Sequence, residues 1–426
     1  MLDIKFIREN PEKIKKAIQN KGLNIDIDKF LDLDKRKNQL LKEVESLRAK
    51  QNKLGKNDIV EAQKIKSEIK KIEPELEKIQ KEFQNLILQI PNLPLEDVPV
   101  GLSEEENKII KTVGQKPKFD FQPKTHWELA EKLDLIDKER AAKVAGSRFA
   151  YIKGPLVKLQ WALMQFGVDV LTDKKTLAKI AKEAKLKVNS KPFVPILPPL
   201  MIKTAPYSAM DRLEPKEERY KIEGEDLWLQ GSAEHVLGSM YIDEILPEEM
   251  FPIRYVGYAT SFRKEAGSYG KDMEGIIRMH QFDKLEMESF TTAEESLVEH
   301  YFMIAIQEYL MQQLKLPYEV ILKCTYDIGK PNARGVDINV WLPGQNKYRE
   351  THTADYMTDY QARRLQTKIK RKSGKIELIH TNDATVFSQR PLIAILENYQ
   401  QKDGTIRVPK VLQKYTGFSK INRKNP

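Results

Sequence analysis

Hydrophobic residues between Phe30 and Leu86 recur at alternating steps of four and three positions. A period of 3.5 with one narrow apolar seam predicts helices that coil around each other with a left-handed twist. Gly55 and Asp58 interrupt this pattern with a helix stop and an N-cap, and so short a turn requires the two helices to run antiparallel. We therefore expect a coiled-coil arm over residues 28–88, roughly 37 Å long. The expected seam consists of Phe30, Leu33, Leu40, Val44, Leu47, Leu54, Ile65, Ile69, Ile72, Leu76, Ile79, Phe83 and Leu86.

The arm should project into solvent, because a helix packed into a larger bundle needs a wider apolar stripe. Pro74 lies inside the second predicted helix, where it should kink or interrupt the hydrogen-bond ladder. Around the tip, residues 48–71 include eight basic and three acidic side chains. This charge is compatible both with an ordinary solvated face and with a surface that follows phosphates.

The pattern changes after the arm. Residues 90–114 are rich in proline and acidic side chains, which indicates a linker. From Phe119 onward, helical stretches such as 157–171 alternate with short β-like runs without a regular βαβ repeat. We expect a helical domain over residues 1–115, followed over 116–426 by an α+β domain with a largely antiparallel sheet. The chain contains neither GxGxxG nor GxxxxGK[ST], so Rossmann and P-loop nucleotide sites are not supported.

Composition narrows the class of protein. Charged residues make up 31% and hydrophobic residues 40% of the chain, and the net charge of +10 fits a nucleic-acid partner without establishing one. Cys324 is the only cysteine, which excludes an internal disulfide and a thiolate zinc cluster. The six histidines lack ligand spacing, so we predict no zinc. Without a signal peptide or an apolar run of about 20 residues, we expect a soluble cytoplasmic protein without a membrane partner.

A dense run of charged and aromatic residues spans 261–286. Arg263 and Glu265 are two positions apart and would share one face of a strand. Arg278 and Phe282 would share a face of a helix, although the β-branched residues before them leave a strand equally open. The glycine-rich segment between the two pairs reads as a loop that joins two strands. An isolated Arg-x-Glu is more often a structural ion pair than a catalytic site.

The complete run resembles motif 2 of class II aminoacyl-tRNA synthetases in its seryl form. It matches every fixed position of the pattern FRxEAG followed by GxxRxHQFxKxE. Ser232 stands where the family's TxE loop has threonine, and Thr353 stands where its E-x-x-S segment has serine. The loosest resemblance is to motif 1, over 157–172 and 193–199. The remaining similar segments are 229–234 (TxE loop), 349–353 with 359–364 (E-x-x-S before DFQARR) and 382–398 (motif 3).

This resemblance implies a class II antiparallel sheet flanked by helices and preceded by the arm. It also implies activation of L-serine by ATP to seryl-adenylate, followed by transfer to the 3′ end of tRNA(Ser) and of tRNA(Sec). The implied cofactor is Mg²⁺, with ATP as a substrate, and the implied assembly is a homodimer through motif 1. The basic residues at the arm tip then become tRNA-binding candidates: Arg48, Lys50, Lys53 and Lys56.

The resemblance implies catalytic roles for Arg263, Glu265 and Arg390. Arg263 would bridge the α-phosphate and the serine carboxylate, while Phe282 and Arg390 would cover the two faces of adenine. Glu350 and Thr353 would hold Mg²⁺ through hard oxygen ligands. The implied serine-binding residues are Ser232, Ala233, Glu234, Arg263, Glu286, Asn382 and Ala384. The implied ATP-binding residues are Arg263, Lys264, Glu265, Arg278, Met279, Phe282, Glu350, Thr351, His352, Thr353 and Arg390.

Ala384 departs from the family's pattern, which carries serine or threonine there to contact the substrate hydroxyl. The spacing from Asn382 to Arg390 matches the family, so assigning the role to Thr385 would require a local shift of the alignment. Either Thr385 or Asp383 substitutes, or the hydroxyl relies more on Glu286.

Two other functions remain to be weighed. A class II paralogue that loads a carrier protein would lack the N-terminal arm, which is present here. A non-catalytic RNA-binding protein on the same fold would be expected to lose Arg263, Glu350 or Arg390, and all three are present. The sequence therefore favours a serine–tRNA ligase.

Overall fold

The computed structural model describes residues 1–55, 58–264 and 275–423 of the chain. It contains two compact units, Met1–Pro94 and Leu95–Pro426. The boundary thus lies earlier than the expected position after residue 115. The expected linker 90–114 is also different in the structure, because its second half forms a strand of the large sheet.

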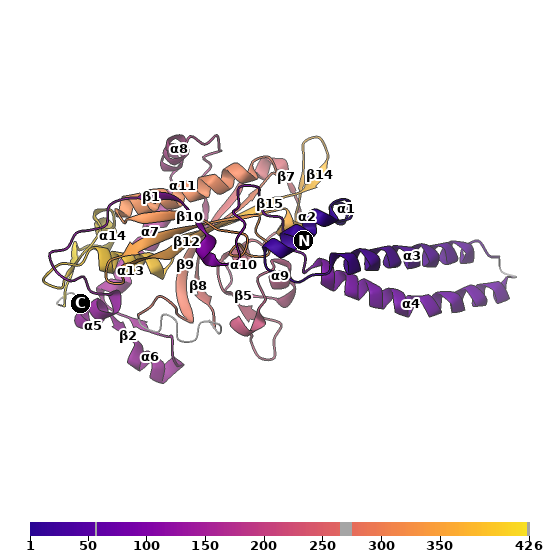
Figure 1. Cartoon of the computed structure of the whole chain (residues 1–426), viewed down its shortest axis with the longest axis horizontal. Coiled ribbons are helices and arrows are strands. Elements are labelled where there is room, and N and C mark those ends of the chain that lie inside the picture. Colours follow the sequence, from indigo (N-terminus) through magenta and orange to yellow (C-terminus); the bar gives the residue numbers. More distant parts are fainter. Residues whose placement is uncertain (56–57, 265–274, 424–426) are drawn as a thin grey trace. The chain divides into compact units, whose positions relative to one another are not determined.

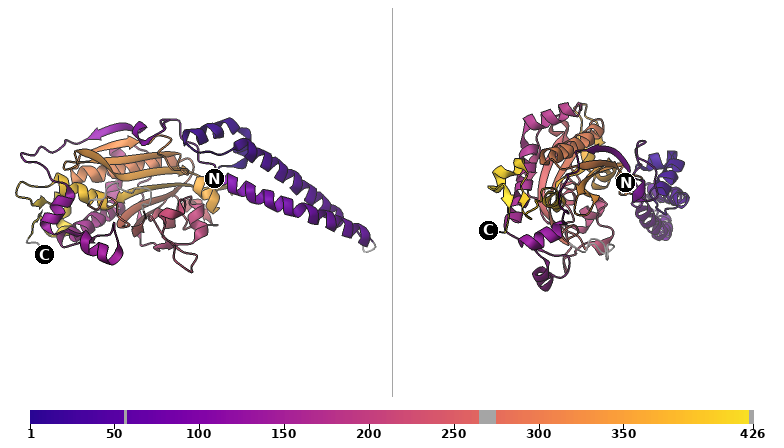
Figure 2. Two further views of the ribbon diagram at one scale, coloured as in Figure 1. Left: turned by 60° about the horizontal axis from the view of Figure 1, so that its bottom comes forward. Right: turned by 60° about the vertical axis from the view of Figure 1, so that its left-hand side comes forward.

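The described residues of the first unit form four helices. These are α1 (Ile4–Glu9), α2 (Pro11–Asn20), α3 (Ile27–Gln51) and α4 (Ile59–Ile87). Asp26 caps α3 by accepting a hydrogen bond from the backbone N–H of Lys29 at 2.9 Å. α3 and α4 lie side by side as the predicted helical hairpin (Figures 1 and 2). Their apolar contact follows the predicted seam: Leu40, Val44, Ile65, Ile69, Leu76 and Ile79 are buried, with Leu33, Leu47, Leu54 and Ile72 packed against them.

Pro74 does not interrupt α4, which runs without a break from Ile59 to Ile87. Pro74 is exposed, and so is Lys70, whose carbonyl loses its helical partner. Because this side of the helix faces solvent, water can satisfy the freed carbonyl, and the helix continues.

The second unit is built on an eight-stranded sheet with the order β1-β10-β11-β12-β15-β9-β8-β4. Every neighbouring pair is antiparallel except β4 and β8, which are parallel. The predicted α+β class with a largely antiparallel sheet is therefore confirmed. The strands are β1 (Lys108–Val113), β4 (Val194–Ile196), β8 (Ile253–Phe262), β9 (Gln281–Thr291), β10 (Tyr318–Leu322), β11 (Arg334–Leu342), β12 (Lys347–Thr358) and β15 (His380–Phe387).

Three helices cover one face of this sheet: α7 (Pro155–Thr172), α11 (Ser296–Leu314) and α13 (Gln389–Asn398) (Figure 1). Side chains alternate along each strand, so one set meets these helices and the other set meets the opposite face. On β15, Ala384 and Val386 belong to the core beneath the helices. Asp383 and Thr385 consequently point to the opposite face.

The remaining elements surround this framework. No helix among the described residues is both long and apolar enough to cross a membrane. The smaller helices are α5 (His126–Leu133), α6 (Lys138–Ala145), α8 (Lys174–Glu183), α9 (Thr204–Ala209), α10 (Glu234–Leu237), α12 (Tyr360–Leu365) and α14 (Gln413–Thr416). The short strands are β2 (Ile136–Asp137), β3 (Tyr151–Ile152), β5 (Met201–Ile202), β6 (Trp228–Leu229), β7 (Ile245–Pro247), β13 (Lys368–Lys370), β14 (Ile376–Leu378), β16 (Ile406–Arg407) and β17 (Lys420–Ile421).

Candidate active site

A cavity of about 500 Å³ lies on the sheet face opposite α7, α11 and α13. Its lining comes from β9, β12 and β15 together with α10, the start of α13 and the segments beside β8 and β9. It unites most of the residues that the sequence placed at a site: Glu234, Arg263, Arg278, Met279, Phe282, Glu286, Glu350, Thr351, Thr353 and Arg390 all line it.

The two strands predicted for motif 2 are present as β8 and β9, which pair antiparallel, while most of the loop predicted between them lies outside the described residues. Phe282 and Glu286 lie on β9, so the strand interpretation is correct for them, whereas Arg278 precedes that strand. Arg263 directly follows β8, and its backbone exchanges two hydrogen bonds with His280, at 3.0 and 2.8 Å. His280 therefore helps to fix the backbone at Arg263. Glu265 lies outside the described residues.

Arg263 is held by contacts with neighbouring residues. Its Nε donates to the carbonyl of Gly231 at 3.0 Å, and its guanidinium lies 5.4 Å from the centroid of the Phe282 ring. The positive charge of Arg263 also opposes the rise that burial causes in the pKa of Glu286, and it adds to the lowering of the pKa of Glu350. Arg263 is thus close to both ends of the cavity.

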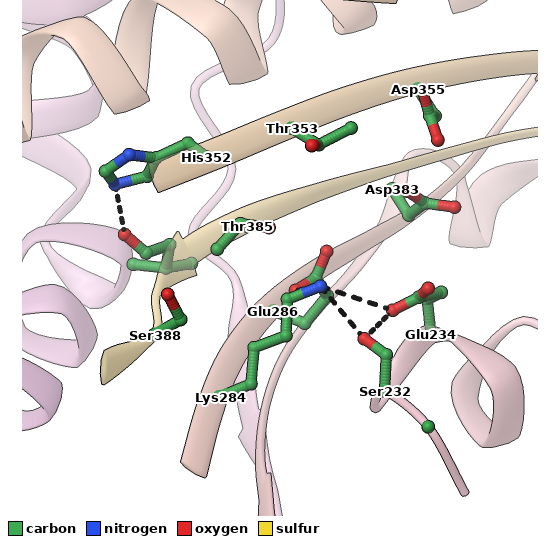
Figure 3. A network of polar contacts seen from close by, with 12 residues as sticks. Ser232, Glu234, Lys284, Glu286, His352, Thr353, Asp355, Asp383, Thr385 and Ser388 are labelled. Carbon is green, nitrogen blue, oxygen red and sulfur yellow. Dashed lines mark hydrogen bonds and ion pairs between the residues drawn. The ribbon is translucent and has the colours of Figure 1, made fainter. Parts of the chain in front are cut away.

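One end of the cavity carries a network around Lys284 (Figure 3). The Lys284 ammonium lies 2.8 Å from Glu286 Oε2, 3.0 Å from Ser232 Oγ and 3.8 Å from Glu234 Oε2. Ser232 in turn donates a hydrogen bond to Glu234. Two carboxyl groups and a hydroxyl therefore converge where the sequence predicts an amino-acid substrate.

The two carboxyl groups of this network titrate differently. Burial raises the pKa of Glu286 to about 8, although Lys284 opposes the shift. Burial would also raise the pKa of Glu234, but Lys284 and His235 together hold it well below its usual range. Near neutral pH, Glu234 is therefore ionised. Glu286 keeps its proton as long as no positively charged ligand lies beside it.

The other end of the cavity is built from Arg390, Glu350 and Thr353. Arg390 Nη1 lies 2.9 Å from Glu350 Oε1, and the Thr353 hydroxyl donates to the same oxygen at 3.4 Å. Burial favours a raised pKa for Glu350, yet Arg390 and Lys323 lower it to about 2. An ionised carboxylate beside a hydroxyl supplies the hard oxygen atoms that Mg²⁺ prefers, so these residues fit the implied metal. Among the described residues, no group of three or more histidine, cysteine or carboxylate side chains is arranged to hold a metal.

The N-terminus of α13 opens into the cavity, since Ser388, Gln389 and Arg390 all line it. Ser388 caps the helix by accepting a hydrogen bond from the Arg390 backbone N–H at 3.3 Å. Arg390 thus lies in the first turn of α13, which spans Gln389–Asn398. A helix N-terminus beside an arginine is suited to an anionic group such as phosphate.

Ala384 and Asn382, expected to contact serine, do not reach the cavity. Ala384 pairs across the sheet with Ala354 and Met287, and all three are in the core beneath the helices. Asn382 is fully buried and donates to the carbonyl of Ser296 at 3.3 Å. The alternation of β15 instead directs Asp383 and Thr385 into the cavity.

Four further predicted residues lie beside the cavity and do not line it, and one of them is Ser232 of the Lys284 network. His352 points away from it, hydrogen-bonded to the Val386 carbonyl at 3.0 Å (Figure 3). Ala233 packs against Leu237 and Ala259. The ammonium of Lys264 lies 5.3 Å from the centroid of the Tyr220 ring.

Several cavity residues were not predicted. Lys284 is a fixed position of the motif 2 pattern, so the sequence did carry a signal for it. Asp383 and Thr385 were noted only as substitutes for Ala384, and strand alternation would have selected them. Arg212 and Asp355 belong to no motif that we recognised. Five of the additional polar residues that line the cavity are Arg212, Lys284, Asp355, Asp383 and Thr385.

At the arm tip, Arg48 forms an exposed ion pair with Glu73 at 3.0 Å. Lys50 and Lys53 are exposed, and Lys56 lies outside the described residues. An exposed pair of this kind contributes little stability, so Arg48 can exchange its partner for another anion.

Comparison with known proteins places this site in a family. Residues 1–94 match the seryl-tRNA synthetase N-terminal domain, and residues 218–399 match the class II tRNA synthetase core domain (G, H, P, S and T). The serine–tRNA ligase of Thermodesulfovibrio yellowstonii is 40% identical over 441 residues, covering 99% of this chain and 100% of the relative. That of Symbiobacterium thermophilum is 39% identical over 438 residues, with the same coverage.

A solved structure gives the same result. The seryl-tRNA synthetase from Pyrococcus horikoshii, in a crystal structure with ATP, superimposes with a TM-score of 0.88 at 36% identity and covers 99% of both chains. The sequence motifs, the antiparallel sheet with its cavity and these full-length similarities agree: the chain belongs to the seryl-tRNA synthetase family of class II aminoacyl-tRNA synthetases.

Proposed function

We propose that the cavity carries out the first step of serine–tRNA ligation, with Arg263 as the residue that joins its two ends. The observation behind this is the position of Arg263, whose charge influences both Glu286 and Glu350. A planar guanidinium can bind a carboxylate and a phosphate oxygen at once. Arg263 would therefore align the carboxylate of serine with the α-phosphate of ATP, and this alignment supplies much of the rate of such a transfer.

The amino-acid end would bind serine through Glu234, Glu286 and Ser232. The substrate ammonium would lie against the two carboxyl groups, a position near which Lys284 now supplies positive charge. Asp383 and Thr385 would contact the hydroxyl. Alanine leaves such polar groups unpaired, and this is how a small pocket can reject it strongly.

The other end would bind ATP. Phe282 would stack on adenine and Arg390 would cover its opposite face, while Arg278 and the start of α13 would contact phosphates. Glu350 and Thr353 would hold Mg²⁺, which neutralises phosphate charge when bound. The expected contact of Glu265 with adenine or the tRNA end stays a prediction.

The hairpin of α3 and α4 would bind tRNA(Ser). Its tip exposes Arg48, Lys50 and Lys53, whose charges suit the phosphate backbone. Removing residues 48–71 should spare serine-dependent exchange between ATP and pyrophosphate, while abolishing the charging of tRNA. Loss of both activities would instead mean that the hairpin supports the fold. Charging of tRNA(Sec) stays a prediction.

We further propose a homodimer through the motif 1 region. β4 lies at the edge of the large sheet, and Val194, Leu197 and Trp161 nearby are exposed apolar side chains. An edge strand beside exposed apolar residues favours pairing with a second copy. Sedimentation or mass photometry would test the dimer. The cytoplasmic location follows from the proposed tRNA substrate and stays a prediction.

Exchange between ATP and pyrophosphate, measured with serine, threonine and alanine, is the direct test of the amino-acid specificity. Serine should support exchange far better than the other two. No serine-dependent exchange would contradict the proposal. Exchange without charging of tRNA would favour a paralogue that loads a carrier protein.

A further inference from the structure

Three carboxyl side chains form a row across the sheet beside the cavity. In the strand register, Asp355 of β12 pairs with Asp383 of β15, and Asp383 pairs with Glu288 of β9. Directly paired residues of antiparallel strands project from the same face, which here is the cavity face (Figure 3 shows Asp355 and Asp383). The exposed fraction is 7% for Asp355, 4% for Asp383 and 0% for Glu288. Three adjacent buried carboxylates would repel one another if all were ionised.

One guanidinium faces this carboxyl row, and it reaches two of the three members. Arg212 Nη2 lies 3.5 Å from Asp383 Oδ2 and 3.6 Å from Asp355 Oδ2. Both oxygens of Glu288 are buried without a hydrogen-bond partner among the described residues. Two lysines lie near this region. Lys284 is engaged by Glu286 and Ser232, and Lys323, which interacts with Asp355 at the far end of the row, lies 3.7 Å from Asp337.

The other groups around Glu288 do not supply a positive charge of their own. Glu286 lies two residues away on the same face of β9, Tyr255 pairs with Glu288 from β8, and Glu234 of α10 adds further negative charge. An ionised carboxylate is strongly disfavoured in such a position, whereas a protonated one can donate a hydrogen bond.

We propose that Glu288 is a positioning residue that shares one proton with Asp383, and so presents the ionised carboxylate of Asp383 as the acceptor for the hydroxyl of the amino-acid substrate. This rests on the proposed function and deepens it, since it names the group that recognises the hydroxyl. Burial raises the pKa of both Glu288 and Asp383 well above the usual range, while Arg212 opposes the shift in both. Because Arg212 lies beside Asp383, the proton resides on Glu288 and the negative charge on Asp383.

The arrangement makes serine binding sensitive to alkaline pH. When Glu288 loses its proton, two paired carboxylates repel each other and Asp383 turns from its position. The KM for serine should therefore rise at high pH, while the KM for ATP stays constant, because the adenine and phosphate contacts lie at the other end of the cavity.

The test compares Glu288→Gln and Glu288→Ala with the wild-type chain by exchange between ATP and pyrophosphate over pH 6.5 to 9.5. Glutamine retains a neutral donor, so Glu288→Gln should keep the KM for serine within about threefold and lose part of its alkaline rise. Glu288→Ala removes the donor and should raise the KM for serine by about tenfold, without changing the KM for ATP. Groups that all three proteins share, such as Glu286 and the serine ammonium, cancel in this comparison.

Each outcome decides the proposal. An unchanged alkaline rise in Glu288→Gln, or an unchanged KM for serine in Glu288→Ala, would overturn it. If Glu288→Ala fails to fold, the pH profile of Glu288→Gln decides alone. A wild-type chain without serine-dependent exchange would contradict the proposed function itself, which distinguishes the two failures.

Discussion

Arg390 donates through Nη1 to both the side chain and the main chain of Glu350, at 2.9 and 3.0 Å. A metal bound by Glu350 must share its carboxylate with this guanidinium. Glu350→Gln keeps the shape but removes the charge, so the Mg²⁺ concentration for half-maximal pyrophosphate exchange should rise at least about tenfold. A magnesium titration of the exchange rate measures this. Glu377 of β14 also pairs with an arginine, Arg371, so Glu377→Gln is the matched control. It should leave the magnesium titration unchanged.

Thr385 and Ala384 are adjacent but lie on opposite faces of β15. Thr385→Val removes a hydroxyl from the cavity and should raise the KM for serine by about tenfold, with little change in stability. Ala384→Ser would place a hydroxyl in the core and should cost about 1–3 kcal/mol of unfolding free energy without improving the KM. Steady-state exchange kinetics and chemical denaturation separate the two effects. Improved serine binding in Ala384→Ser would show that the alignment, and not the strand register, identifies the contact.

The protonation of Glu286 should make both the unfolding free energy and the binding of serine depend on pH. Its pKa in the folded chain is about 8, against an ordinary value of 4.5. Below pH 4.5 the folded and the unfolded chain both carry this proton, so Glu286 does not change the unfolding free energy there. As pH rises from there to about 8, only the unfolded chain gives up its proton, and the unfolding free energy falls. Glu286→Gln should therefore be more stable than the wild type at pH 8, but not at pH 4.5.

Serine binding should also release a proton from Glu286, because the substrate ammonium favours the ionised carboxylate. Calorimetry of serine binding at pH 7 in two buffers of different ionisation enthalpy measures that release directly. Equal binding enthalpies in the two buffers would contradict the assignment. Glu286→Gln should show no release and much weaker binding.

Arg48, Lys50 and Lys53 should act on tRNA alone. Replacing all three by alanine should weaken tRNA binding, reduce its dependence on salt, and leave pyrophosphate exchange intact. Filter binding across a range of salt concentrations measures how steeply the affinity for tRNA falls with salt. The triple replacement of Lys174, Lys175 and Lys182 on α8 removes the same charge from another exposed surface and should leave tRNA binding unchanged.

The sequence predicted the hairpin and most of the cavity because both depend on local patterns. The seam from Leu40 to Ile79 needs only helical periodicity, and motif 2 is a contiguous run. Ala384 was misplaced because motif spacing counts residues along the chain, whereas contact with a ligand depends on which face of β15 a residue occupies. The carboxyl row could not be predicted from the sequence, because Asp355, Asp383 and Glu288 are brought together only by the pairing of three strands.

The domain boundary was misjudged for a related reason. Lys108–Val113 is exposed along most of its length and lacks an apolar face, so its sequence resembles a linker. It is a strand because β10, more than two hundred residues later, provides a partner. Strand pairing over such a separation leaves no local signal.

The pairing of β1 with β10 has a practical consequence for producing the catalytic unit by itself. A fragment beginning at residue 116 would lose β1 and leave β10, with Tyr318, Val320 and Leu322, as a bare edge of the sheet. Unpaired edges of this kind recruit other chains, so that fragment should aggregate on expression. A fragment that begins at Leu95 retains the covering strand and should remain in solution, which makes the choice of start codon decisive for crystallisation and ligand screening.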